Sequence, residues 1–222
     1  MINAVVLAAG ASKRMGKPKP LLRFRDSPSR SASYSAKQHF AAQDESAERG
    51  RTFLEQIIAV LKLSDADRIT VVLGAEAEAI KKTVDLSGVN IVINKDYEKG
   101  QLSSLIAAIK TTPPQTQAIL VCLADMPFIT AEVVNEIIGK FKETDAPIIV
   151  PVFDNKRGHP PLFARAVFDE LLSAPAEQGA RFVLCSNEQR ILELQTSESG
   201  ILIRIDTPDD YRLHFGAAQT PP

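Results

Sequence analysis

The chain has 222 residues, of which 45% are hydrophobic, and its 26 Lys and Arg nearly balance its 27 Asp and Glu. This length suits a single domain, and the composition provides enough apolar material for a buried core. A formal net charge of −1 argues against a globally basic nucleic-acid-binding or membrane-surface protein. No apolar run reaches the length of a membrane span, and the N-terminus carries no secretory signal.

The two cysteines bear on the cellular compartment. Cys122 lies inside an apolar run and Cys185 stands alone, so the pair suggests neither a disulfide framework nor a set of zinc ligands. We therefore expect a protein of the reducing cytoplasm, with no nucleic-acid partner and no membrane partner.

Short apolar runs alternate with segments of helical spacing along the chain. The runs are rich in Val and Ile and apolar on both faces, which is typical of strands in a covered parallel sheet. Such an alternation predicts a three-layer α/β domain. The predicted strands are Ile2 to Leu7, Arg68 to Leu73, Val89 to Ile93, Ala118 to Leu123, Pro147 to Val152 and Ile201 to Ile205.

Five helices are predicted, and three of them have a recognisable start. Thr52 and Glu55 have the spacing of a capping box, Thr130 is a good N-cap, and Thr207 precedes a proline at the first helical position. The other two helices cover about residues 76–84 and 102–110. We assign residues 1–216 to a single domain and residues 217–222 to a short tail.

One segment interrupts this pattern. Residues 26–50 are rich in serine, contain no strand-like run and continue into a polar, helix-tolerant stretch. We interpret the segment as a solvated insertion within the domain. The alternative is a lid over the loop that precedes it.

A basic, glycine-containing loop follows the first predicted strand directly. Small residues let the backbone approach a ligand closely, and Gly10 and Gly16 permit unusual dihedral angles. Four cations lie within seven residues, and no acid lies among them. Backbone amides combined with positive charge are what phosphate oxygens require, and open α/β sheets bind ligands at the carboxyl ends of their strands. The cations are Lys13, Arg14, Lys17 and Lys19.

The spacing of this loop excludes two familiar phosphate-binding motifs. A Walker A loop has four residues between its glycines, whereas five separate Gly10 from Gly16, and Pro18 takes the place of the hydroxyl residue. The dinucleotide pattern GxGxxG is absent as well. A flexible basic loop with two incidental glycines remains the alternative when the loop is considered alone.

Two acids come directly after predicted strands. Asp125 follows the apolar run that ends at Ala124, and Asp206 follows the run that ends at Ile205. Mg²⁺ prefers one or two carboxylates and keeps its other positions for water and phosphate, so both acids are candidate metal ligands. For Asp206 the alternative is an ordinary acid near a helix start, where the helix dipole favours it.

Other candidate residues lie at or beyond strand ends. Gly10, Gly74 and Asn94 have the position expected of residues that frame a nucleobase and a ribose. Ser103 and Ser104 lie near a helix start, where they either bind nucleotide or only cap the helix.

The residue sequence of the basic loop resembles a motif of a known family. Residues 7–19 read Leu-Ala-Ala-Gly-x-Ser-x-Arg-Met-Gly-x-Pro-Lys, which resembles the opening motif of the nucleotidyltransferases related to molybdenum cofactor guanylyl- and cytidylyltransferases. Further segments are similar to later motifs of the same family, so the resemblance covers nearly the whole chain outside the insertion. These segments are residues 100–105 (Gly-Gln-Leu-Ser-Ser-Leu), 123–127 (Leu-Ala-Asp-Met-Pro), 157–160 (Arg-Gly-His-Pro) and 205–210 (Ile-Asp-Thr-Pro-Asp-Asp).

The resemblance implies a Rossmann-like nucleotidyltransferase fold with a mostly parallel sheet, Mg²⁺ as cofactor and molybdopterin as acceptor. Ala9 and the pair Pro18-Lys19 are more similar to the CTP-using branch, so transfer of CMP from CTP is the expected reaction. A molybdoenzyme that receives the product is a possible partner. GTP as donor, a sugar- or alcohol-phosphate acceptor, and a non-catalytic carrier of the cofactor are the alternatives. A carrier is expected to lack Lys19 or Asp125, and both are present.

These expectations assign a role to each candidate residue. Lys19, Arg14 and Asp125 are the predicted catalytic residues, and Asp125 and Asp206 the predicted metal ligands. Arg157, His159 and Pro160 are placed at the acceptor, although a histidine between a glycine and two prolines is also a common rigid loop residue. The predicted nucleotide-binding residues are Leu7, Ala8, Ala9, Gly10, Lys19, Gly74, Asn94, Gly100, Ser103 and Ser104.

Overall fold

The computed structural model describes residues 1–24, 50–176, 179–186 and 188–216. Most of the predicted insertion and the whole predicted tail therefore lie outside the described residues. Within the described part, eight strands form one sheet. They are β1 (Ile2–Ala8), β2 (Arg68–Leu73), β3 (Asn90–Ile93), β4 (Ala118–Leu123), β5 (Ile148–Phe153), β6 (Lys156–Arg157), β7 (Leu162–Ala164) and β8 (Ile191–Gln195).

Seven α-helices accompany this sheet in the described residues. The helices predicted after Thr52, Thr130 and Thr207 all begin where their caps indicate, and the side chain of each threonine accepts a backbone N–H of the first turn. The helices are α1 (Phe53–Lys62), α2 (Ala77–Thr83), α3 (Gln101–Thr111), α4 (Ala131–Thr144), α5 (Phe168–Ser173), α6 (Arg181–Ser186) and α7 (Pro208–Phe215).

The sheet has a parallel half and a mixed half. Its order is β3-β2-β1-β4-β7-β5-β6, with β8 paired to β5. Strands β3, β2, β1 and β4 are all parallel, whereas β7 runs antiparallel to both β4 and β5. The predicted mostly parallel α/β sheet is confirmed, and its parallel half is the part that the sequence pattern described best.

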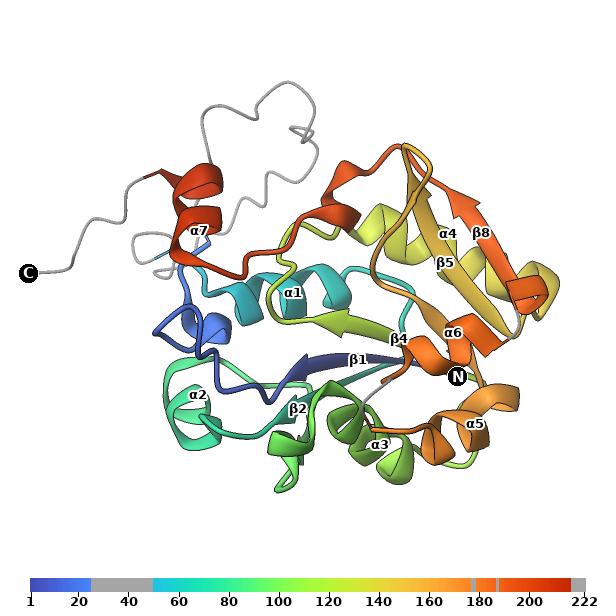
Figure 1. Cartoon of the computed structure of the whole chain (residues 1–222), viewed down its shortest axis with the longest axis horizontal. Coiled ribbons are helices and arrows are strands. Elements are labelled where there is room, and N and C mark those ends of the chain that lie inside the picture. Colours follow the sequence, from blue (N-terminus) through green and yellow to red (C-terminus); the bar gives the residue numbers. More distant parts are fainter. Residues whose placement is uncertain (25–49, 177–178, 187, 217–222) are drawn as a thin grey trace, which may run out of the picture.

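The helices cover both faces of the sheet, because alternate side chains of β1 point in opposite directions. Ala4 and Val6 pack in the cluster that contains α1 and α4, whereas Val5 and Leu7 pack in the cluster that contains α3 and α5. Figure 1 shows these helix pairs on opposite sides of the sheet, which confirms the three layers.

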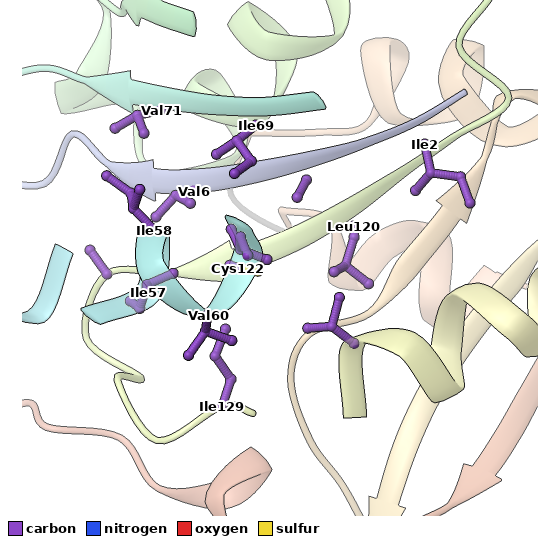
Figure 2. Packing of buried hydrophobic residues seen from close by; sticks show 14 of the residues in the cluster. Ile2, Val6, Ile57, Ile58, Val60, Ile69, Val71, Leu120, Cys122 and Ile129 are labelled. Atoms are coloured by element: carbon purple, nitrogen blue, oxygen red, sulfur yellow. The ribbon is translucent and has the colours of Figure 1, made fainter. Parts of the chain in front are cut away.

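Figure 2 shows the cluster on the α1 side. Ile57 and Ile58 of α1 pack there with Val6 of β1 and Cys122 of β4. Cys122 is buried in the core, as its apolar run indicates, and this burial raises the pKa of its thiol to about 12.

A third, smaller cluster is mostly aromatic. It joins Phe53 at the start of α1, Phe128 in the loop after β4, and Tyr211 and Phe215 of α7. The rings of Phe128 and Phe215 are stacked with centroids 5.3 Å apart. This cluster attaches the C-terminal helix behind the loop that carries Asp125.

The strand predicted at Ile201 to Ile205 is wrong. Residues Ser199–Leu202 form a 3-10 helix, and the chain then runs extended without joining the sheet. Its backbone is paired with loops, since Ile201 accepts the N–H of His159 at 3.0 Å and Ile205 donates to Asp125 at 2.8 Å. Ile201 and Ile205 are fully buried but belong to different clusters, which explains a strand-like composition without a strand.

None of the helices in the described part of the chain combines the length and the apolar character that a membrane span requires.

Candidate functional site

The basic loop folds back on itself after β1. Ser12 has a left-handed backbone with φ of 50°, and its carbonyl accepts the N–H groups of Met15 and Gly16. The Ser12 hydroxyl accepts the N–H of Lys19 at 2.9 Å, at the point where a 3-10 helix (Lys19–Leu21) begins. These bonds hold the backbone of Lys19 beside the carboxyl end of β1.

The Lys19 ammonium group bridges the two predicted metal ligands. Its Nζ donates to Oδ2 of Asp125 at 3.0 Å and also to Oδ1 of Asp206. The Lys19 side chain is only 13% exposed, and Asp125 is buried. Arg14 reaches the same group from the solvent side, with a guanidinium nitrogen 3.3 Å from Oδ2 of Asp206. The structure therefore brings together Lys19, Arg14, Asp125 and Asp206, although Lys19 and Asp206 are 187 positions apart in the sequence.

Asp206 is held by its neighbours on both sides. The preceding residue Ile205 donates its N–H to the carbonyl of Asp125, and the N–H of Asp206 itself donates to the carboxylate of Asp210 at 2.9 Å. Burial alone raises the pKa of Asp206. The hydrogen bond from Lys19 and the charges of Arg204, Lys19 and Arg14 outweigh that effect, so the pKa lies below its ordinary value.

Arg204 is a member of this group that the sequence reasoning missed. Its Nε lies 3.0 Å from Oδ2 of Asp125 and 3.3 Å from Oδ1 of Asp206. The signal was a single arginine within an otherwise apolar run, between Ile203 and Ile205. Because that run was interpreted as a strand, the arginine had no assigned position.

A cavity of about 230 Å³ opens beside these charges. Leu7, Ala8, Ala9 and Gly10 form one wall with Lys19, and the start of α3 forms another. Of the other residues predicted to bind nucleotide, Gly100 and Ser104 line the cavity, whereas Gly74, Asn94 and Ser103 do not. The remaining lining residues are Ser12, Pro20, Tyr97, Gln101, Leu123, Ala124, Asp125 and Arg204.

Asn94 does not line the cavity but supports the wall formed by the start of α3. Its amide nitrogen donates to the hydroxyl of Ser103 at 2.8 Å and to that of Ser104 at 3.0 Å. Gly100, immediately before α3, has φ of 94°, which is a conformation that favours glycine. The buried amide therefore connects the end of β3 to the first turn of α3, and so positions the cavity wall that Ser104 lines.

Gly74 also has a supporting position. A Cβ atom at this residue would lie 2.5 Å from the carbonyl oxygen of Ala9. Ala75 donates its N–H to that same carbonyl at 3.1 Å. Glycine at position 74 thus allows the end of β2 to approach the loop that forms the first cavity wall.

The three residues predicted to bind the acceptor are not gathered at one point. Arg157 is exposed in β6 and pairs with Glu193 at 2.7 Å, away from the cavity lining. His159 is half-buried, and its buried Nδ1 has no hydrogen-bond partner among the described residues. Pro160 is buried and follows a cis peptide bond.

His159 is near the charged group even though it does not line the cavity. Burial lowers its pKa, and the charge of Arg204 acts in the same direction. A hydrogen bond with the Val121 backbone and the negative charge of Asp125 act in the opposite direction, and burial prevails. His159 is therefore neutral at pH 7.

Comparison with known proteins places this geometry in a family. The sequence model of the MobA-like NTP transferase domain matches residues 46–191. The chain is 26% identical to the molybdenum cofactor cytidylyltransferase of Escherichia coli K12, over 95% of this chain and 93% of that protein. It is 25% identical to the nicotine blue oxidoreductase of Paenarthrobacter nicotinovorans, over 96% of both chains.

A similar fold is found among solved structures. The crystal structure of Rv0371c from Mycobacterium tuberculosis H37Rv superposes with a TM-score of 0.78 at 28% identity, and the match covers 97% of both chains. A second structure of that protein, a complex with manganese, has a TM-score of 0.70 at 26% identity and covers 98% of this chain and 99% of that one. With a family match that spans well over half of its residues, the chain belongs to the family of MobA-like NTP transferase domains.

Proposed function

We propose that this protein transfers CMP from CTP to molybdopterin and releases pyrophosphate. The observation that carries the proposal is the contact of Lys19 with Asp125 and Asp206 beside a cavity at the carboxyl end of β1. Membership of the MobA-like family supports the reaction class, and the similarity to the cytidylyltransferase supports CTP and molybdopterin.

In the proposed reaction, a phosphate oxygen of the acceptor attacks the α-phosphorus of CTP. The bond from that phosphorus to the bridging oxygen breaks, and the electron pair leaves with pyrophosphate. The obstacle is electrostatic, because an anion approaches a polyanion and charge grows on the leaving group. Lys19 supplies a compact positive charge at the cavity wall, and Arg14 supplies a planar guanidinium suited to two phosphate oxygens.

Asp125 and Asp206 fit the proposed Mg²⁺. Their oxygens already share one cation, the Lys19 ammonium group, so both face the same point. In the described residues no group of three or more His, Cys, Asp and Glu offers a fuller ligand set. Mg²⁺ needs only one or two carboxylates when phosphates and water complete its shell. When bound, the ion would neutralise phosphate oxygens as a Lewis acid.

The manganese complex of Rv0371c supports a divalent metal in a protein of this fold.

The remaining roles are proposed from position. Leu7, Ala8, Ala9, Gly10, Gly100 and Ser104 would contact the nucleotide directly, whereas Gly74, Asn94 and Ser103 would position those contacts. Arg157, His159 and Pro160 stay proposed for the acceptor side, and a molybdoenzyme stays the proposed recipient of the product. The negative charge of Asp125 acts on His159.

The decisive experiment measures pyrophosphate release from CTP, GTP, ATP and UTP with Mg²⁺, without acceptor and with molybdopterin, a sugar phosphate or an alcohol phosphate as acceptor. Release from CTP that depends on molybdopterin supports the proposal. Release from GTP moves the protein to guanylyl transfer, and release with a sugar- or alcohol-phosphate changes the acceptor. Binding without release points to a carrier, and redox turnover in place of release points to the reaction class named for the Paenarthrobacter relative.

Asp125→Ala provides the matched test of the site. We expect the variant to lose Mg²⁺-dependent turnover while its circular dichroism spectrum and urea midpoint show a folded domain. Asp154→Asn is the control, since Asp154 is exposed in a turn between β5 and β6. Its backbone is left-handed, a conformation that asparagine also adopts readily. Turnover at the wild-type rate in Asp125→Ala removes Asp125 from the mechanism.

A further inference from the structure

The position of Arg204 suits the binding of phosphate as well as the pairing with carboxylates. It lies in the extended segment that follows the 3-10 helix Ser199–Leu202, between two isoleucines that pack in or against the aromatic cluster. Because successive side chains of an extended chain point in opposite directions, Arg204 points away from the aromatic cluster, and it lines the cavity. Its side chain is 47% exposed, so a ligand in the cavity can reach the guanidinium group.

Arg204 and Lys19 occupy the same two carboxylates. Each is within 3.3 Å of Asp125, and each also contacts Asp206. With Arg14, three cations surround two acids, so the group carries an excess of positive charge before any ligand binds. A divalent metal that approaches Asp125 and Asp206 must therefore compete with cations that are already hydrogen-bonded to them.

We infer that Arg204 couples the binding of nucleotide to the binding of metal at this site. A triphosphate in the cavity offers oxygens to Arg204 and Lys19. When either cation exchanges a carboxylate oxygen for a phosphate oxygen, that carboxylate oxygen becomes free to bind the metal. The inference rests on the proposed function, because it takes a nucleoside triphosphate as the ligand. Linkage requires the effect to be mutual, so that metal and nucleotide each raise the affinity of the other.

The exchange of partners predicts two opposite effects of removing the Arg204 charge. Without nucleotide, Arg204→Gln removes a competitor from both carboxylates, and affinity for the metal rises. Without metal, the same variant loses a charge-assisted hydrogen bond to phosphate, and affinity for the triphosphate falls by about tenfold. A variant that is merely misfolded would weaken both.

The test uses the full chain and measures each affinity by itself. Binding of Mn²⁺ to nucleotide-free protein is followed by electron paramagnetic resonance, and binding of CTP in EDTA by isothermal titration calorimetry. We expect Arg204→Gln to bind Mn²⁺ several-fold more tightly and CTP about tenfold more weakly than the wild type. Arg204→Lys keeps the charge and should lie near the wild type in both. Arg212→Gln is the matched control, because Arg212 is an exposed arginine of α7 that pairs with Asp209 and is not a lining residue.

Unchanged Mn²⁺ affinity in Arg204→Gln, or a shift of both affinities in the same direction, overturns the inference. A wild-type chain that binds none of the triphosphates overturns the proposed function instead, and with it the phosphate half of the inference. The two failures are thus separate, since the Mn²⁺ measurement contains no nucleotide.

Discussion

Lys19 is the cation with the most restricted surroundings in the site. Its side chain is 13% exposed, its N–H is fixed by Ser12, and its ammonium group contacts two carboxylates. We expect Lys19→Ala to lower kcat/KM for nucleotidyl transfer about 100-fold. This corresponds to a loss of about 3 kcal/mol of transition-state stabilisation, the scale of one preorganised charge-stabilising group. Steady-state kinetics with CTP and molybdopterin measure the effect.

The control for this change is Lys142→Ala, which removes an exposed lysine of α4. It should leave kcat/KM within the error of the wild type. A Lys19→Ala enzyme with the same rate as this control makes Lys19 a bystander that only balances the charge of the two acids.

The sequence predicted most of this charged group, because the information is local. Lys19 and Arg14 lie in a loop with a recognisable motif, and Asp125 follows a strand that was predicted with its exact bounds. Arg204 was missed because its place depends on how its segment pairs with the loops at His159 and Asp125. Arg157 was predicted near the acceptor, but its charge pairs with Glu193 of β8, a strand that the sequence pattern did not indicate.

Helix α3 begins at the cavity because Asn94 holds its first turn. The amide of Asn94 is buried and donates to Ser103 and Ser104. We expect Asn94→Ala to lower the free energy of unfolding by about 1–3 kcal/mol, the scale for losing buried hydrogen bonds, and to weaken CTP binding as well. Urea unfolding and calorimetric titration measure the two effects.

Asn90→Ala is the matched control, because Asn90 lies in β3, the strand that Asn94 follows. The Asn90 amide donates to the carbonyl of Ile69, and neither Ser103 nor Ser104 is involved. This variant should lose stability without losing affinity for CTP. Equal losses of affinity in both variants mean that the strand as a whole, and not the contact with α3, supports the nucleotide.

Helix α7 begins with a capping box that also fixes Asp206. The Asp210 carboxylate accepts the N–H groups of Asp206 at 2.9 Å and Thr207 at 2.8 Å. These two backbone bonds, together with the Thr207 side chain, lower the pKa of Asp210 from its ordinary 3.8. The cap therefore stabilises the folded state above about pH 3.8 and loses this contribution as the pH falls through the lowered pKa.

We expect Asp210→Asn to cost about 1 kcal/mol of stability at pH 7, and the difference from wild type to shrink in acid. Urea unfolding at pH 7, 5, 4 and 3 tests both statements. Asp209→Asn removes a charge from the same helical turn without breaking the cap, so at pH 7 it should cost less. A difference that stays constant down to pH 3 contradicts the role of the charged carboxylate.

Elements with strong local signals were predicted well, and elements defined by pairing were not. The threonine caps of α1, α4 and α7 act within one turn, so they are visible in the sequence. Strands β6 and β7 have two and three residues, which is too short for a periodic pattern. They exist because β5 and β4 provide their hydrogen-bond partners, and such pairing is a property of the tertiary structure.

Segments from both ends of the chain meet behind the site. Met15 and Phe24 from the N-terminal part pack with Tyr211 and Phe215 of α7, and the Tyr211 hydroxyl donates to the carbonyl of Arg23 at 2.8 Å. The family match covers residues 46–191, so Lys19, Arg204 and Asp206 lie on either side of it. The aromatic cluster is what brings these flanking residues together with Asp125, which lies within the matched part.

The two ends of the predicted insertion are joined in the same region. The N–H of Phe24 donates to the carbonyl of Arg51 at 2.7 Å, that of Phe53 donates to Leu22 at 2.8 Å, and Arg23 forms an antiparallel bridge with Thr52. The chain therefore leaves and re-enters the domain at adjacent points. A short connection can span that gap, and shortening a loop reduces the entropy cost of closing it.

We expect a chain in which residues 26–50 are replaced by a short Gly-Ser linker to fold, with a free energy of unfolding within about 1 kcal/mol of the wild type. Urea unfolding followed by circular dichroism measures it. Phe24→Ala in the full-length chain is the comparison, because the Phe24 ring packs at a tilt against Phe128 and edge-on against Phe215, with centroids 5.5 Å away in both pairs. Its loss should cost about 3–5 kcal/mol. The outcome that would contradict this is a shortened chain that is insoluble or unfolds without cooperativity while Phe24→Ala remains folded. Residues 26–50 would then belong to the structural core of the domain, and their interpretation as an insertion would be wrong.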